Sequence, residues 1–201
     1  LFIAIFATLI ATTLGTLAAV GLSRPQMPYR KPIMALLISP LIVPIIIIAA
    51  GMFFFYSHIG LAYTHLGVIL AHAVMGTPYV VITVTATLIG FDETLIRASG
   101  SLGAKPLRTF FRVIMPLITP GVISGALFAF ITSFDEVVLI YFLADAEQKT
   151  IPIQMWSGLR QQISPSILAV ATMLVTFSVI LLIAVELLRR RSERLRTQVI
   201  S

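Results

Sequence analysis

Long apolar runs, separated by short segments that hold nearly all of the charge, make up this chain of 201 residues. Residues 1–22 contain no charged side chain, and Arg24 follows them. A helix rises about 1.5 Å per residue, so this run is long enough to cross a hydrocarbon core of about 30 Å. The run begins at Leu1 without a basic leader, which favours a fragment that lacks one further N-terminal span.

The next uncharged stretch, from Pro32 to Phe91, is too long for a single span. Polar, aromatic and small residues interrupt it over 57–67, which favours two spans. Lipid cannot satisfy free backbone groups, and no run shows the alternation of a barrel strand, so we expect helices throughout. The predicted spans cover about 1–22, 33–56, 66–90, 113–134 and 166–188. The fold class is therefore an all-α, polytopic transmembrane helix bundle of about five spans, in a single domain over 1–201.

Small residues and prolines inside these runs indicate a packed bundle. Gly15 and Ala19 are four residues apart, as are Gly121 and Gly125, and such pairs allow close helix approach. The alternative is that glycine is simply common in membrane helices. Prolines are expected to kink or end helices at Pro40, Pro44, Pro78, Pro116 and Pro120.

Composition supports a membrane protein and excludes several chemistries. The chain is 58% hydrophobic and only 11% charged, whereas soluble domains carry about 25% charged residues. There is no cysteine, which excludes disulfides, thiolate metal sites and cysteine nucleophiles. His65 and His72 would share a helix face, but no carboxylate or third histidine lies near them, so no metal site is expected.

The basic residues are confined to three segments that five spans would place on one side of the membrane. All but two of the 14 lysines and arginines fall in 24–31, 97–112 and 189–196. The exceptions are Lys149 and Arg160. Cytoplasmic loops carry the excess of positive charge, so the 92–112 loop and the C-terminus are predicted to be cytoplasmic. The net charge of +6 then reflects topology, and no nucleic-acid partner is expected.

The 92–112 loop has the pattern of two short helices joined by a turn. A stripe of small or apolar side chains recurs at helical spacing, at Leu95, Ala98, Ser99 and Leu102. Gly103 follows the stripe where a left-handed helix end is expected, and Pro106 suits the first turn of a second helix. A helix lying on lipid headgroups is the alternative, but the small stripe offers little apolar area and favours docking against a protein.

The segment RASGSLGAKPLRTFFRVIMPLITPG resembles the cytoplasmic coupling loop of binding-protein-dependent ABC transporter permeases. That family's pattern is Glu-Ala-Ala, three residues, Gly, about nine residues, then an aliphatic residue and Leu-Pro. Ala98 and Gly103 match in register, and Met115-Pro116 stands at the Leu-Pro position, whereas Arg97 replaces the glutamate and Ser99 the second alanine. The coupling-loop residues that the resemblance assigns are Arg97, Ala98, Ser99, Leu102, Gly103, Ala104 and Pro106.

The resemblance covers the whole chain and implies a mechanism. The five spans would be the last five of a six-span permease in the bacterial inner membrane. The coupling helix would sit in a cleft on a cytoplasmic ATPase subunit, which binds the ATP and Mg²⁺. A second permease subunit and an extracytoplasmic substrate-binding protein are the other implied partners. The chain itself has no Gly-rich phosphate loop with Lys-Ser/Thr, so neither a cofactor nor a catalytic residue is expected in it.

An acidic motif after the fourth predicted span is the candidate substrate site. The stretch from Ser133 to Arg160, which includes Phe134-Asp135-Glu136 and Thr-Ile-Pro, resembles the matching part of polyamine (spermidine/putrescine) permeases. A polyamine is a chain of ammonium groups and methylenes, so its site needs carboxylates and aromatic faces. The candidate pathway residues are Phe134, Asp135, Glu136 and Tyr141. A solvated span boundary is the alternative for the two acids.

Three other functions are alternatives to a polyamine importer. A permease for another small substrate, such as ferric ion, keeps the same fold. An ATP-independent secondary transporter would predict internal repeats, and the two halves of the chain show none. An intramembrane enzyme would need a nucleophile and a base close together, but the serines, histidines and acids are scattered over both predicted sides.

Overall fold

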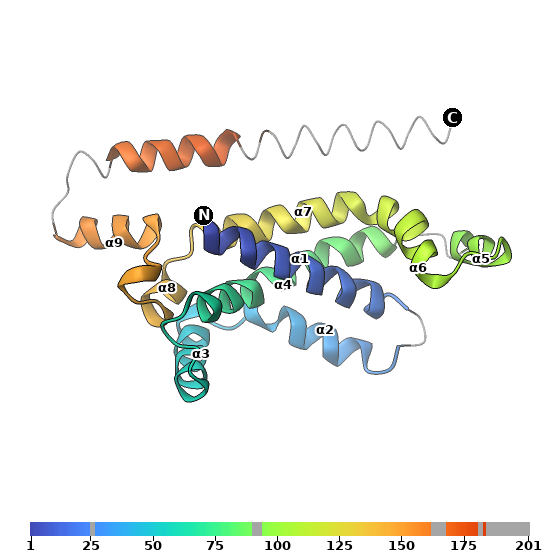
Figure 1. Cartoon of the computed structure of the whole chain (residues 1–201), viewed down its shortest axis with the longest axis horizontal. Coiled ribbons are helices and arrows are strands. Elements are labelled where there is room, and N and C mark those ends of the chain that lie inside the picture. Colours follow the sequence, from blue (N-terminus) through green and yellow to red (C-terminus); the bar gives the residue numbers. More distant parts are fainter. Residues whose placement is uncertain (25–26, 90–93, 162–167, 181–182, 184–201) are drawn as a thin grey trace.

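The structure is a computed structural model that describes residues 1–24, 27–89, 94–161, 168–180 and 183. Regular structure in this part is entirely helical, as expected. Three helical segments are long and apolar enough to cross a membrane: α1 (Phe2–Leu22), α4 (His65–Ile89) and the run Pro106–Phe134 that contains α7 (Met115–Phe134). They lie side by side along the long axis of the molecule (Figure 1). A bent pair of helices makes a fourth span if it counts as one.

Small residues bring these three helices together. The buried face of α1 repeats every three or four residues, at Ala4, Ala7, Ala11, Gly15 and Ala19. A Cβ on Gly15 would lie 2.7 Å from the Cβ of Val80 on α4, and one on Gly125 would lie 2.7 Å from the Cα of Val80. Real Cβ atoms do not approach so closely, so both predicted small-residue pairs sit in helix contacts that only small residues permit.

The segment expected as a single span over 33–56 is broken. It forms α2 (Arg30–Ile38), a 3₁₀ turn (Ser39–Leu41) and α3 (Ile45–Ile59), and the two halves meet at 101°. Pro44 caps α3 with an extended ψ of 129°. Proline has no N–H to donate to the preceding turn, so the α-helical ladder of α2 does not continue through Pro40, which lies in the 3₁₀ turn, and α3 begins after Pro44.

The run Pro106–Phe134 is continuous, but it changes from α-helix to π-helix and back to α-helix. It begins with α6 (Pro106–Thr109) and passes through a π-helical turn, η2 (Phe110–Ile114), before α7. In this turn the Met115 N–H donates to the Phe110 carbonyl, five residues back. Pro116 has no N–H for the Arg112 carbonyl and its ring would crowd that group, so a wider turn relieves the clash.

Shorter elements cover the end of the bundle opposite α5 (Thr94–Ser101). These are α8 (Val138–Leu143), a 3₁₀ turn (Ala146–Gln148) and α9 (Ile151–Gln161), and α8 packs against α3 (Figure 1). The Tyr63 N–H donates to the Leu143 carbonyl at 3.0 Å and ties the α3–α4 connection to α8. An apolar helix follows at Leu168–Ile180. Most of the remainder of the span expected over 166–188 lies outside the described residues.

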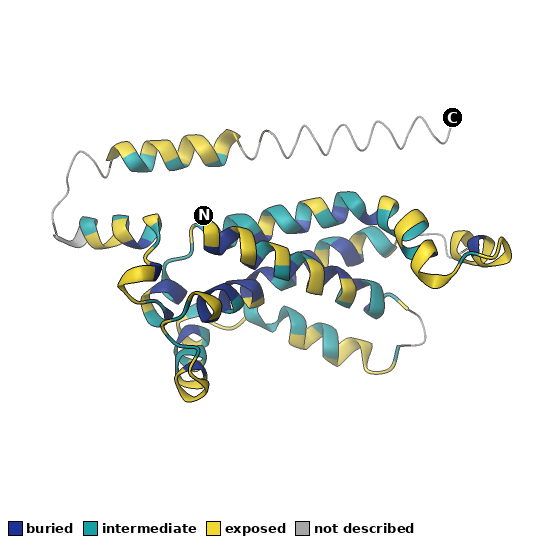
Figure 2. Cartoon of the chain, in the orientation of Figure 1, coloured by how far each residue is buried: buried dark blue, intermediate teal, exposed yellow. Residues whose placement is uncertain are grey.

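Burial follows the packing of the long helices. Figure 2 shows buried residues on the sides of α1, α4 and α7 that face one another, and exposed residues on the outside. Many of the exposed side chains are large and apolar, including Leu36, Ile42 and Phe54. An apolar exterior of this extent needs lipid or protein against it, in keeping with a membrane bundle.

Candidate coupling loop and transport site

The turn that joins α5 to α6 closes as its sequence predicts. Gly103 has a φ of +77°, a left-handed conformation that glycine adopts without strain. Its N–H donates to the Gly100 carbonyl at 2.9 Å, and the Ala104 N–H donates to the Ser99 carbonyl at 3.0 Å. These bonds satisfy carbonyls that the end of α5 would otherwise leave open. Pro106 then starts α6 in the first helical turn.

A hydroxyl pair holds the two helices together. The Ser99 and Thr109 side-chain oxygens are 2.9 Å apart, and only 9% and 7% of these residues are exposed. The Ser99 hydroxyl also donates to the Ile96 carbonyl at 2.8 Å. Ser99 therefore faces α6. It does not belong to the outward surface of the loop, although its spacing had grouped it with Leu95 and Leu102.

The outward face of the loop is apolar and basic. Leu102 is 88% exposed, and Leu95 and Leu107 are also exposed. Lys105 and Arg108 are exposed beside them. Single exposed leucines are ordinary, but several on one protruding helical turn form a surface for a partner.

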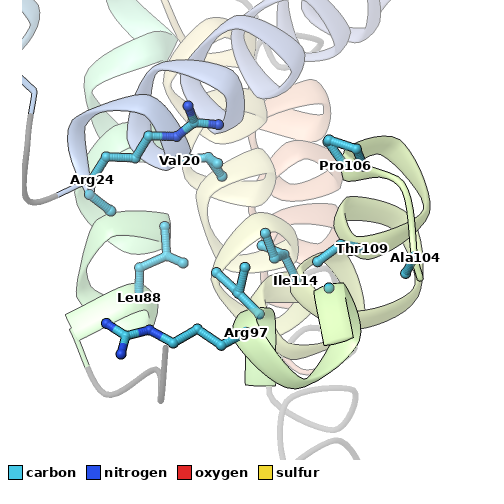
Figure 3. Close-up of a pocket in the computed structure, with 11 residues that line it drawn as sticks. Val20, Arg24, Leu88, Arg97, Ala104, Pro106, Thr109 and Ile114 are labelled. Atoms are coloured by element: carbon cyan, nitrogen blue, oxygen red, sulfur yellow. The ribbon is translucent and has the colours of Figure 1, made fainter. Parts of the chain in front are cut away.

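A cavity of about 510 Å³ lies between this loop and the adjoining ends of α1 and α4 (Figure 3). Val20 and Arg24 line it from the α1 side and Leu88 from α4. Arg97 extends from α5 toward the side on which Leu88 lies. Ala104 and Pro106 also line it. Among the predicted coupling residues, Arg97, Ala104 and Pro106 thus line the cavity, whereas Leu102 lies on the outward surface.

The two predicted acids lie just beyond the end of α7, outside the spanning helices. Glu136 caps α8, because its Oε1 accepts from the Val138 N–H at 2.6 Å and from the Leu139 N–H at 3.1 Å. Burial raises the pKa of Glu136, and the charge of neighbouring Asp135 raises it further, while the two backbone bonds act in the opposite direction. Burial also raises the pKa of Asp135. Both carboxyls therefore take up protons more readily than free side chains.

The four candidate pathway residues do not line one cavity in the described part of the chain. Phe134 stacks on Phe130 with ring centroids 5.6 Å apart, and it borders a small cavity of about 20 Å³. Tyr141 is 70% exposed and lines a separate apolar groove of about 400 Å³ with Phe142 and Trp156. The described residues therefore do not bring the two aromatic side chains, Phe134 and Tyr141, to one cavity.

His72, which the sequence analysis considered only as a metal ligand, forms a buried polar contact between α4 and α7. His72 on α4 is 1% exposed, and its Nδ1 lies 2.8 Å from Ser133 Oγ on α7. Its Nε2 is buried without a hydrogen-bond partner. The signal was present in the small residues of α7, since Gly121, Gly125, Ala129 and Ser133 repeat every four residues and are all buried. Among the described residues no group of three or more His, Cys, Asp or Glu side chains could hold a metal ion.

Comparison with known families decides the identity. The family described as "binding-protein-dependent transport system inner membrane component" matches residues 11–194. The chain belongs to this family. It is a multi-pass membrane permease subunit of an ABC importer, and permeases of this kind operate with an ATPase and a substrate-binding protein. The resemblance stated from the coupling-loop motif is confirmed.

Several relatives match most of this permease's length. The spermidine/putrescine transport system permease protein PotC of Haemophilus influenzae is 29% identical over 190 residues, covering 94% of this chain and 74% of the relative. The putrescine transport system permease protein PotI of Escherichia coli is 32% identical, covering 87% and 64%. A probable sulfate transport system permease protein, cysT of Chlorokybus atmophyticus, is 29% identical, covering 94% and 71%.

The fold of the permease matches a solved transporter. The methionine ABC transporter MetNI, in an inward-facing conformation, superposes with a TM-score of 0.74 at 18% sequence identity. The match covers 94% of this chain and 91% of the other. At this identity the likeness supports the fold.

Proposed function

We propose that this permease carries a polyamine such as spermidine or putrescine across the inner membrane, together with a second, different permease subunit. A cytoplasmic ATPase drives it and an extracytoplasmic binding protein delivers the substrate. The observation that carries the substrate class is similarity to PotC and PotI over most of this chain. The ATP and Mg²⁺ belong to the ATPase.

The coupling residues are proposed from the geometry of the loop. The turn at Gly103 presents Leu102 outward at the tip of the helix pair, with Ala98 and Lys105 exposed near it. An apolar tip with a basic rim suits insertion into a cleft on a soluble partner. Arg97, Ala104 and Pro106 act from the other side, because they border the cavity beneath α5.

The orientation follows from the charges. The described basic residues near α5 come from separate segments, at Arg24, Arg30, Lys31, Arg97, Lys105, Arg108 and Arg112. We assign this end to the cytoplasm by the positive-inside rule. The five arginines between 189 and 196 place the C-terminus on the same side.

Uptake by the purified complex tests the substrate. The permease would be purified with its native partner subunits and reconstituted with the binding protein in vesicles. We expect ATP-dependent accumulation of labelled spermidine or putrescine, and none of labelled sulfate. Sulfate accumulation without polyamine accumulation would overturn the substrate proposal and favour the second candidate, a permease for another solute, which the sulfate relative at equal identity supports.

A further inference from the structure

The coupling helix α5 has little packing against the spans. Its principal contacts with other elements are to α6 and to η2. The cavity of about 510 Å³ lies between it and the ends of α1 and α4. Among the described residues, α5 therefore packs on the spans mainly through α6 and η2, which are the first turns of the run Pro106–Phe134.

The hydroxyl pair is a buried side-chain hydrogen bond between α5 and that run. Each hydroxyl has one proton to donate. When Ser99 donates its proton to the Ile96 carbonyl, Thr109 is the donor to Ser99 Oγ across the 2.9 Å contact. Both side chains are buried, and a buried hydroxyl that loses its partner is costly, so the pair resists separation of the helices.

We propose that Ser99 and Thr109 are positioning residues that pin the coupling helix to the span, so that α5 and Pro106–Phe134 move as one body. The inference rests on the proposed docking of the ATPase on α5. The family pattern has alanine where this chain has Ser99, and alanine can make no such bond. The pin is thus a feature of this chain that adds to the backbone bonds of the turn at Gly103.

Ser99→Ala and Thr109→Val remove the bond from either side, and the double variant removes both hydroxyls. Thr109→Ser keeps a hydroxyl at the same place. Ser101→Ala is the matched control, because Ser101 is an exposed serine on α5 that bonds only within its own helix, to the Arg97 carbonyl at 3.1 Å. The measurement is substrate transported per ATP hydrolysed by the reconstituted complex, with the amount of copurified ATPase determined for each variant.

We expect each single variant to lower transport per ATP about fivefold, because a hydrogen bond of this kind contributes on the order of 1 kcal/mol. The double variant should be no worse than the singles, Thr109→Ser and Ser101→Ala should resemble the wild type, and all should retain the ATPase. An unchanged ratio in both single variants would overturn the pin. If the variants lose the copurified ATPase and the wild type keeps it, the positioning role would also be overturned, because the two hydroxyls would then serve to dock the ATPase. A wild-type complex without bound ATPase would instead overturn the proposed function.

A covalent version of the contact gives an independent test. The chain has no cysteine, so Ser99→Cys/Thr109→Cys introduces the only pair in it. Oxidation by an added thiol oxidant such as diamide joins the two sulfurs, and dithiothreitol separates them. We expect near wild-type coupling when the pair is oxidised and about a fivefold loss when it is reduced. Equal coupling in the two states would overturn the pin.

Discussion

His72 Nδ1 lies 2.8 Å from Ser133 Oγ in the buried contact between α4 and α7. The bond ends a line of close approaches along the two antiparallel helices, in which Ala129 meets Gly76 and Gly125 meets Val80. Ser133 is one helical turn beyond Ala129, so the same repeat that brings the helices together also places the hydroxyl against the ring. The helix contact and the polar bond are therefore one structural unit, and it lies directly beside Phe134 and Asp135.

Removing the hydroxyl of this pair should destabilise the bundle. Ser133→Ala leaves both ring nitrogens of His72 without a partner, since Nε2 already has none. We expect a loss of about 1 kcal/mol in the free energy of unfolding, in line with interhelical bonds in membrane proteins. The measurement is unfolding of the purified protein in mild detergent. Thr119→Ala is the control, because Thr119 bonds only within α7, to the Met115 carbonyl at 2.7 Å; equal stability losses in the two variants would contradict the assigned role.

A methyl group on Gly125 should lower the free energy of unfolding more than the loss of the Ser133–His72 hydrogen bond does. The new Cβ would lie 2.7 Å from the Cα of Val80, and backbone cannot move aside as a flexible side chain can. We expect Gly125→Ala to cost about 1–3 kcal/mol, as overpacking does. Gly51→Ala on α3 is the matched control, since a Cβ there would meet no atom within 4 Å. Thermal unfolding of both variants checks this, and similar melting temperatures would show that α7 can shift away from α4.

A bulky residue at Gly103 should impair coupling and leave insertion intact. Val adopts the left-handed φ of +77° at a cost of about 1–2 kcal/mol, so Gly103→Val reshapes the turn that presents Leu102. We expect transport to fall at least severalfold with normal amounts of protein in the membrane. Gly100→Ala on the same helix is the control, because it has room for a Cβ and no positive φ. Normal uptake by Gly103→Val would refute the coupling assignment.

The sequence predicted the parts of this molecule that depend on local or periodic signals. The helix found at His65–Ile89 was expected over 66–90, because polar residues at 57–67 and the charges after Phe91 bound its uncharged run. The turn at Gly103 followed from one glycine and one proline. The break at Pro40 and Pro44 was expected as a kink, but its 101° angle depends on packing around it.

The site was less predictable, because its contacts join residues far apart in the sequence. His72 and Ser133 are 61 positions apart, and only the three-dimensional register of α4 and α7 brings them together. The acidic motif was read as a pair of like carboxylates, yet Glu136 caps α8 through two backbone bonds. Tyr141 and Phe134, which are close in sequence, border different cavities, because Phe134 ends α7 and Tyr141 lies on α8.

The acidic motif should make polyamine transport sensitive to pH. The pKa values of Asp135 and Glu136 are both raised, chiefly by burial, so each carboxyl loses its charge at a higher pH than a free side chain would. The ionised form attracts an ammonium group and the neutral form does not. If the acids contact the substrate, the apparent KM for spermidine should rise as the pH falls through these raised values. Uptake kinetics across a series of external pH values measure this.

Charge and capping can be separated at Glu136. Glu136→Gln keeps a carbonyl oxygen that can accept from Val138 and Leu139, so it should preserve α8, whereas Glu136→Ala removes the cap at a cost of about 1 kcal/mol. Asp135→Asn combined with Glu136→Gln should therefore fold normally, retain the ATPase, raise the KM for spermidine about tenfold and abolish its dependence on pH. A double variant with wild-type kinetics at every pH would show that both acids only form the boundary of the span and the cap of α8.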